Sequence, residues 1–453
     1  MSPTNDPHGA RRAPVRRGLA TVAVLLALIV AALEGTVVTT AMPTITAELG
    51  DRALYGWVFS AFLVANAVSV LVCGKLSDSF GRRPTFVLGA SLFIAGSLLS
   101  AVAQSVPMLI AFRVLQGLGA GGIQPVAMTV TTDLYTLQER ARIQGLLTAV
   151  WGSANVAGPL LGGAIVARTS WRWVFLAPAP FALLAALVLL ATYRDAPRSQ
   201  HGARGIAGSL LAGLTVSLAL LALEPRFPHR HLAGLLFAAA ALLFAFTQSR
   251  SPAPLVPRAV LFQPVVRAGL VSGAFAGGLL YLSSAFVPLW MIEHAGKSAT
   301  LAGLPLICLL GGWAVGSTFG VRLFVARGMR WSAGGGYLLA TFAALGLVFA
   351  ARAHSTPAVL ATLTALGLGL GPAASTSLVG PQNHVAPELR GIITSACYAS
   401  RMLGGSVAIG LLGALAPETD RVPFAFRSLV VLAAAGALAA LLLAPPVTRR
   451  REA

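Results

Sequence analysis

The chain has 453 residues, of which 56% are hydrophobic and only 10% are charged. An ordinary soluble domain carries about 25% charged residues, and a mean hydropathy of +0.79 is too high for a protein whose whole surface faces water. The net charge of +19 would suit a nucleic-acid-binding protein, but the basic residues are spread between apolar segments. Composition therefore excludes a soluble globular protein and predicts a membrane protein with no nucleic-acid partner.

Apolar runs recur along the whole chain at the length of about 20 residues that a helix needs to cross about 30 Å of hydrocarbon. The first run is too long for the hydrophobic part of a cleaved signal peptide, so we expect it to be retained. Only short loops separate the runs, which leaves no room for a soluble catalytic domain. We predict fourteen spans, at about 18–42, 54–75, 84–104, 107–131, 142–168, 171–193, 206–225, 230–249, 266–291, 299–324, 332–352, 357–379, 391–416 and 424–444.

Basic residues gather in alternate loops. Four arginines precede the first run, and others follow the second and the last: Arg11, Arg12, Arg16, Arg17, Arg82, Arg83, Arg449, Arg450 and Arg451. Cytoplasmic loops are enriched in Lys and Arg. We therefore expect a multi-pass protein of the inner (cytoplasmic) membrane with both termini in the cytoplasm.

A glycine pattern suggests an internal duplication. A single shift along the chain places Gly74, Gly145 and Gly158 on Gly320, Gly391 and Gly404. Coincidence among 48 glycines is the alternative. The duplication predicts cytoplasmic tails at 1–17 and 445–453, six-helix bundles at 18–193 and 266–444, and an intervening segment, 194–265, with two inserted helices at about 206–225 and 230–249.

The loop between the second and third runs carries a motif of glycines and charges, which reads Gly74-Lys-Leu-Ser-Asp78-Ser-Phe-Gly81-Arg82-Arg83-Pro84. Its glycines permit a tight turn, and Pro84 suits the first turn of the next helix. Taken alone, such a loop could serve only to set the topology.

The fifth run contains small residues on one helix face together with a proline: Gly145, Gly158, Pro159, Gly162 and Gly163. Small residues at this spacing let a neighbouring helix approach closely, and a proline loosens the helix where it would bend. Ordinary helix packing is the alternative.

Glu34, in the first run, is the only carboxylate well inside any predicted span. Burying an ionised side chain there costs at least about 2.5 kcal/mol, so the group should be protonated part of the time. That property suits a proton carrier. A permanent ion pair with Arg113 of the fourth run is the alternative.

In this order, the motifs resemble those of the major facilitator superfamily and, within it, the fourteen-span drug:proton antiporter group. The resemblance covers essentially the whole chain, although that group more often has Asp at Glu34 and Gly at Ala154. It implies an all-α membrane protein with the major facilitator fold, built from two six-helix bundles plus two inserted helices (14 transmembrane helices). It also implies roles for three sets of residues: a cytoplasmic gate of Gly74, Asp78, Gly81, Arg82 and Arg83, with Asp78 facing the helix start at Arg390 and Gly391; an antiporter motif in the fifth run; and proton transfer at Arg113.

Polar and aromatic side chains within the spans are candidates for a substrate cavity between the two halves, where repeated-bundle transporters bind their substrates. The candidates are Trp57, Gln116, Gln124, Trp151, Asn155, Tyr281, Trp313, Asn383 and Arg401. Aromatic faces and few charges favour a small hydrophobic or cationic substrate. Membrane lipids are the other expected partner, and we expect a monomer.

The sequence lacks the motifs of ATP hydrolysis and of common hydrolases, since no GxxxxGK[ST], HExxH or GxSxG occurs. Its three cysteines have no CxxC or histidine partner, so no metal is expected. We predict a transporter without catalytic residues, with no cofactor besides the proton gradient, that exports hydrophobic or amphipathic compounds such as drugs and antibiotics in exchange for protons. The alternatives are an exporter of one native metabolite or lipid, an uptake symporter, and a non-transporting scaffold or sensor.

Overall fold

The structure is a computed structural model that describes residues 17–51, 54–135, 137–195, 206–223, 229–251, 258–298, 301–386, 389–416 and 420–444, and every regular element within these ranges is helical. The expected tails at 1–17 and 445–453 lie outside the described residues, except for Arg17. This all-helical construction suits a membrane protein because a helix satisfies its own backbone hydrogen bonds in a medium that offers none.

The first half of the chain forms the helices α1 (Arg17–Leu49), α2 (Tyr55–Phe80), α3 (Arg82–Ala101), α4 (Val106–Leu134), α5 (Leu137–Arg168), α6 (Arg172–Leu176) and α7 (Ala179–Thr192). Two further helices follow, α8 (Ile206–Leu223) and α9 (Arg230–Arg250). The second half forms α10 (Arg258–Leu261), α11 (Pro264–Glu293), the 3-10 helix η2 (Leu301–Gly303), α12 (Leu304–Arg327), α13 (Met329–Arg352), α14 (Thr356–His384), α15 (Arg390–Leu415) and α16 (Arg421–Leu443).

Twelve helices in the described part of the chain are long and apolar enough to cross a membrane, whereas the sequence predicts fourteen spans. The remaining two predicted spans coincide with α5 and α8, whose apolar stretches in the described residues are shorter, Ala157–Arg168 and Leu210–Ala222. Several side chains of both helices lie outside the described part of the structure, so the count of twelve holds for the described residues alone.

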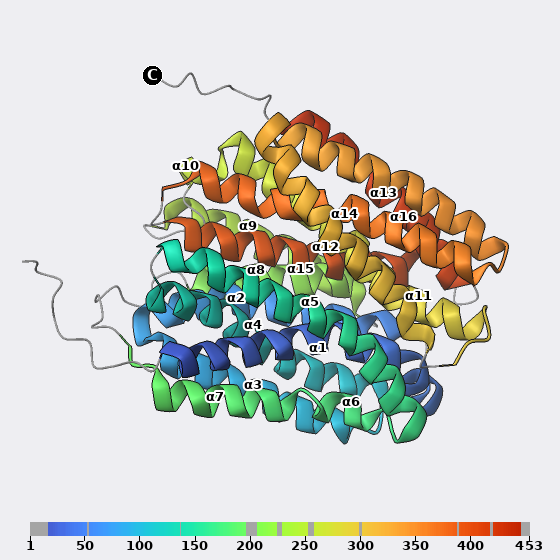
Figure 1. Cartoon of the computed structure of the whole chain (residues 1–453), viewed down its shortest axis with the longest axis horizontal. Coiled ribbons are helices and arrows are strands. Elements are labelled where there is room, and N and C mark those ends of the chain that lie inside the picture. Colours follow the sequence, from blue (N-terminus) through green and yellow to red (C-terminus); the bar gives the residue numbers. More distant parts are fainter. Residues whose placement is uncertain are drawn as a thin grey trace, which may run out of the picture.

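The helices run roughly side by side in two groups, with the blue-to-green helices of the first half below and the yellow-to-red helices of the second half above (Figure 1). The helices α8 and α9 pack against each other, and α8 lies against both α2 and α15, one helix from each group. Most of α9 is exposed, and Ala233 and Ala240 are the only buried residues in its described part. The inserted pair therefore lies across the boundary between the groups and presents α9 outward.

The buried apolar residues join the two groups at only one end of the bundle. At the end where α1 finishes and α2 begins, here called the α1–α2 end, one cluster contains Val37 and Tyr55 of the first group and Phe286 and Ile409 of the second. At the opposite end, here called the α2–α3 end, the clusters belong to one group each. Within the described residues, the halves thus share a core at the α1–α2 end and have separate cores at the α2–α3 end.

Hydrogen bonds reinforce the shared core. The hydroxyl of Tyr55 donates to the carbonyl oxygen of Ala285 on α11 at 2.5 Å. Ser60 and Ser406 each donate to the other's backbone carbonyl oxygen, both at 3.2 Å. These bonds fasten α2 to α11 and α15, so the α1–α2 end of the bundle is closed by polar as well as apolar contacts.

Candidate functional site

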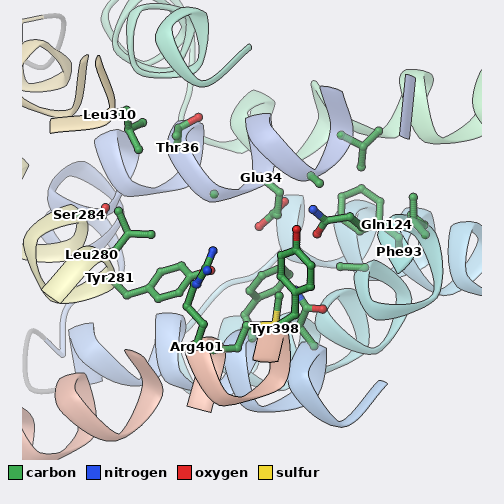
Figure 2. Close-up of a pocket in the computed structure, with 18 of the residues that line it drawn as sticks. Glu34, Thr36, Phe93, Gln124, Leu280, Tyr281, Ser284, Leu310, Tyr398 and Arg401 are labelled. Carbon is green, nitrogen blue, oxygen red and sulfur yellow. The ribbon is translucent and has the colours of Figure 1, made fainter. Parts of the chain in front are cut away.

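A cavity of about 120 Å³ lies between the two groups of helices, beside the point where the shared core begins. Its walls come from α1, α2, α3 and α4 on one side and from α11, α12 and α15 on the other. Figure 2 shows Glu34 reaching into this space from α1, with Arg401 and Tyr398 of α15 directed toward it from the opposite side. The cavity is large enough for several waters or a small ligand group.

The carboxylate of Glu34 is buried, with one oxygen bonded to the guanidinium of Arg113 on α4. The other oxygen accepts a hydrogen bond from the side-chain amide of Gln116 at 2.8 Å. That amide also donates to Ser97 of α3 at 2.8 Å, and its oxygen accepts from Arg113 at 2.6 Å. Glu34 therefore stands at the cavity wall as part of a buried polar network.

Arg113 is held from behind and does not line the cavity. Its guanidinium lies 4.0 Å from the centroid of the Phe62 ring, and its Nε donates to the backbone oxygen of Val58 at 3.4 Å. The ion pair with Arg113, which the sequence offered as the alternative to a proton carrier at Glu34, is thus present.

The glycines of α5 allow this helix to approach α1 closely, just beyond Glu34. A Cβ atom at Gly158 would lie 1.9 Å from the hydroxyl oxygen of Thr36, and one at Gly162 would lie 2.8 Å from the backbone oxygen of Val37. Pro159 on the same helix lies against Gly303, which belongs to the other half. The motif therefore packs α5 against α1 and against the facing half.

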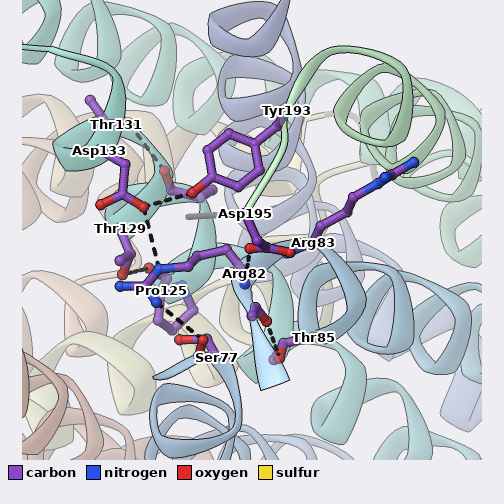
Figure 3. A network of polar contacts seen from close by, with 12 residues as sticks. Ser77, Arg82, Arg83, Thr85, Pro125, Thr129, Thr131, Asp133, Tyr193 and Asp195 are labelled. Atoms are coloured by element: carbon purple, nitrogen blue, oxygen red, sulfur yellow. Dashed lines mark hydrogen bonds and ion pairs between the residues drawn. The ribbon is translucent and has the colours of Figure 1, made fainter. Parts of the chain in front are cut away.

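A second polar network surrounds the motif between α2 and α3 (Figure 3). Gly81 alone separates the two helices, with a φ of 106° that L side chains rarely adopt. The carboxylate of Asp195, just after α7, accepts hydrogen bonds from the backbone N–H groups of Arg82 at 2.6 Å and Arg83 at 3.3 Å. A carboxylate at a helix N-terminus also complements the helix dipole. Asp195 thus caps α3, whose own cap residue is a glycine.

The side chain of Arg82 extends this network to α4 and α7. Its Nε lies 3.3 Å from Asp133 Oδ2, which also accepts a hydrogen bond from the Tyr193 hydroxyl at 2.7 Å. Burial, the hydrogen bond and the charge of Asp133 raise the pKa of Tyr193 and keep its phenol protonated as a donor. The network ties the α2–α3 turn to the ends of α4 and α7.

A family model of the Major Facilitator Superfamily matches residues 24–409. The chain belongs to this superfamily.

Several curated relatives of this facilitator are transporters. An uncharacterized MFS-type transporter of Mycobacterium tuberculosis is 30% identical over 428 residues, covering 91% of this chain and 62% of the relative. The multidrug transporter protein MdtP of Bacillus subtilis is 31% identical over 419 residues, covering 88% and 75%. Efflux pump dotC of Dothistroma septosporum is 42% identical over 154 residues, covering 34% and 27%. This chain thus spans 62% of the length of the mycobacterial relative.

Solved structures share the facilitator fold. A POT family peptide transporter superposes with a TM-score of 0.71 at 16% identity, covering 97% of this chain and 99% of the other. A bacterial homolog of the human lysosomal transporter Spinster, in an inward-facing and unoccupied conformation, gives 0.68 at 15% identity, covering 95% and 98%. At these identities the likeness shows the fold alone. Family and fold together identify a multi-pass membrane protein of the Major Facilitator Superfamily.

The structure brings some of the predicted cavity residues together. Gln124, Tyr281, Trp313 and Arg401 line the cavity with Glu34, and Gln116 lies behind it. Trp57 and Asn383 do not line it; Trp57 is near the start of α2, and Asn383 is exposed at the end of α14. Three predicted site residues have side chains that lie outside the described part of the structure: Trp151, Asn155 and Asp78. The environment of Gly145 lies outside it as well.

Sequence reasoning missed several polar residues of these sites, among them Asn66, Ser97, Tyr398 and Asp195. Asn66 and Tyr398 line the cavity, and Ser97 belongs to the Glu34 network. A uniform search for polar and aromatic residues within the predicted spans would have found Asn66 and Tyr398. No sequence signal singles out Ser97 or Asp195, because their roles depend on contacts between segments far apart in the chain.

Gly162→Ala is expected to lower the free energy of unfolding by about 1–3 kcal/mol, the usual cost of overpacking a core. The added methyl group would meet the backbone of Val37, which cannot rotate away. Thermal unfolding in detergent measures the effect. Gly335→Ala on α13 is the matched control, since nothing lies within 4 Å of its added Cβ. Equal unfolding temperatures for both variants would contradict the assigned packing.

Asp195→Ala is expected to cost about 1–2 kcal/mol of stability, because two backbone N–H groups at the start of α3 lose their acceptor. Asp420→Ala is the control. Its partner Arg427 is 3.7 Å away and both side chains are about half exposed, so it should contribute less than about 1 kcal/mol. If Asp195→Ala unfolds like Asp420→Ala in denaturant titrations, the capping assignment is wrong.

Proposed function

We propose that this facilitator is a proton-coupled antiporter of the fourteen-span drug:proton group, which exports hydrophobic or amphipathic compounds across the cytoplasmic membrane by alternating access. The buried carboxylate of Glu34 at the cavity wall, joined to Arg113, carries the proposal. The names of the relatives support export, since they include a multidrug transporter and an efflux pump. In the proposed organisation both termini are cytoplasmic, α8 and α9 are inserted between two six-helix bundles, and the protein works as a monomer among lipids.

The arrangement of the cores supports one step of the cycle. Under the proposed topology the α1–α2 end faces outward and the α2–α3 end faces the cytoplasm. The shared core then closes the outer end, and the separate cores leave the halves free to part at the inner end. In this state an ionised Glu34 is paired with Arg113, and a compound enters the cavity from the cytoplasm.

The proton step belongs to the opposite arrangement, in which the cavity faces outward. A proton that reaches Glu34 neutralises the carboxylate and weakens its bond to Arg113. Return to the inward arrangement and loss of that proton restore the ion pair. One cavity thereby serves the compound and the proton alternately, which couples their movements in opposite directions.

The inner gate of the proposed cycle lies where α2 runs beside α15. A Cβ at Gly74 would lie 3.8 Å from the Ser395 hydroxyl oxygen, so the helices are neighbours near the predicted latch. We propose that Asp78 engages the start of α15 at Arg390 and Gly391 when the inner end closes, because a helix N-terminus attracts a carboxylate.

Export is tested in cells that produce the protein and are loaded with either of two fluorescent compounds, cationic ethidium or anionic fluorescein. The proposal predicts faster loss of at least one compound than in cells without the protein, and loss of that difference when a protonophore collapses the gradient. Export unaffected by the protonophore would contradict proton coupling. No difference for either compound would contradict export of amphipathic compounds.

A further inference from the structure

Arg401 is a cation at the cavity wall that makes no ion pair within the described residues. Its guanidinium donates one hydrogen bond, to the backbone oxygen of Ala374 at 3.0 Å, and lies 5.7 Å from the Trp313 ring and 5.6 Å from the Tyr398 ring. Its Nε is buried without a hydrogen-bond partner. Burying a charged donor without a hydrogen-bond partner costs free energy, and an anionic acceptor would offset that cost.

The other charges at the cavity cancel. Among the described residues that line it, Glu34 is the only carboxylate, and Arg113 neutralises that group from behind. The other described lining residues are neutral, so within this part of the structure Arg401 gives the cavity a net positive charge. A cationic ligand would therefore meet repulsion at this wall, whereas an anionic ligand would pair with Arg401.

A second unsatisfied group faces the same space. Asn66 of α2 lines the cavity, is 8% exposed, and has a buried side-chain oxygen without a hydrogen-bond partner. Buried polar groups in proteins are nearly always paired, so an unpaired oxygen at a cavity wall indicates a site for a donor from a ligand or water.

Close helix packing fixes the backbone that carries Arg401. A Cβ at Gly277 of α11 would lie 1.8 Å from the backbone oxygen of Arg401, and one at Gly405 would lie 2.3 Å from the ring of Tyr281. The helices α11 and α15 therefore pack backbone to backbone at this level. Arg401 and Tyr281 are thus held on the wall that faces Glu34 (Figure 2).

We propose that the preferred substrates are amphipathic organic anions, in particular aromatic carboxylates. The carboxylate pairs with Arg401, the ring packs against the aromatic side chains of Tyr281, Trp313 and Tyr398, and a hydroxyl or amide N–H of the ligand donates to Asn66. This inference rests on the proposed export function and replaces the cationic substrate favoured by composition. Since an inside-negative potential drives anions outward and protons inward, exchange of the two would use the potential twice.

The test measures binding of three probes that share one naphthalene ring to the purified full-length protein in nanodiscs: 1-naphthylacetate, neutral 1-naphthylacetamide and cationic (1-naphthylmethyl)trimethylammonium. The acetate should bind at least about tenfold more tightly than the amide, and the cation least tightly. Arg401→Gln should remove the preference for the acetate, and Arg401→Lys should keep part of it. Arg250→Gln is the matched control, because Arg250 also lies over an aromatic ring but far from the cavity, on α9.

Equal binding of the three probes, tighter binding of the cation, or an unchanged acetate preference in Arg401→Gln would each overturn the inference. The wild-type comparison does not depend on the folding of any variant. The binding measurement also separates this inference from the export proposal. A preference for the anion without proton-driven transport would support the anionic substrate and refute proton-coupled export. Proton-driven transport of ethidium alone would support proton-coupled export and refute the anionic substrate.

Discussion

Glu34→Gln is expected to abolish proton-driven export, with a loss of about 100-fold or more, as for removal of a group that transfers protons. Glutamine preserves the size of the side chain and can keep a hydrogen bond to Gln116, but it cannot bind and release a proton near neutral pH. Arg113 loses its carboxylate and keeps Gln116, Val58 and Phe62 as partners, so the protein should be less stable but still folded.

The measurement compares two transport modes in the same liposomes. Uphill transport driven by an imposed pH gradient should disappear in Glu34→Gln, whereas exchange of labelled for unlabelled probe at equilibrium, which needs no proton step, should continue. Glu34→Asp is the matched variant because it keeps the carboxylate, and it should retain part of the uphill activity. Normal uphill transport by Glu34→Gln would refute the assignment of Glu34 as the coupling group.

Arg113→Met is expected to lower the free energy of unfolding by about 3–5 kcal/mol, because it leaves the buried carboxylate of Glu34 without its counterion. Methionine preserves an apolar stem against Phe62, so the loss should come mainly from the charge. The double variant Glu34→Gln/Arg113→Met removes both charges and should recover most of this stability, since a neutral pair costs far less to bury.

The comparison uses chemical unfolding in detergent. Arg427→Met is the control, because the ion pair of Arg427 with Asp420 is exposed and should contribute less than about 1 kcal/mol. If the double variant is as unstable as Arg113→Met alone, charge compensation is not the reason that the pair stabilises the fold. Arg113 would then have another structural role in the network.

The sequence predicted those features that depend on local pattern. Apolar runs gave the positions of most helices, and Gly81 gave the tight turn between α2 and α3. Glu34 was recognisable because a carboxylate inside an apolar run is costly and therefore unusual. The span count differs at α5 and α8, whose stretches of described residues are shorter than a membrane span.

Apart from the ion pair of Glu34 with Arg113, which the sequence offered as an alternative, the contacts between distant segments were not predicted. Glu34, Ser97 and Gln116 lie on three different helices, and nothing in their spacing shows that they meet. Asp195 follows α7 and caps α3, more than one hundred residues away. The cavity likewise joins Asn66 to Arg401 across the two halves. Such pairings follow from the packing of helices against one another, which leaves no local pattern in the sequence.

The most direct test of proton-coupled export is to measure proton movement when a substrate is added. The protein is reconstituted in liposomes that contain a pH-sensitive dye and are clamped at zero membrane potential, and 1-naphthylacetate, fluorescein or ethidium is added outside. With the wild-type protein, we expect at least one compound to drive proton movement in the direction opposite to its own movement. Glu34→Gln should show no such proton movement. Transport of a compound by the wild type without any proton movement would contradict proton-coupled export.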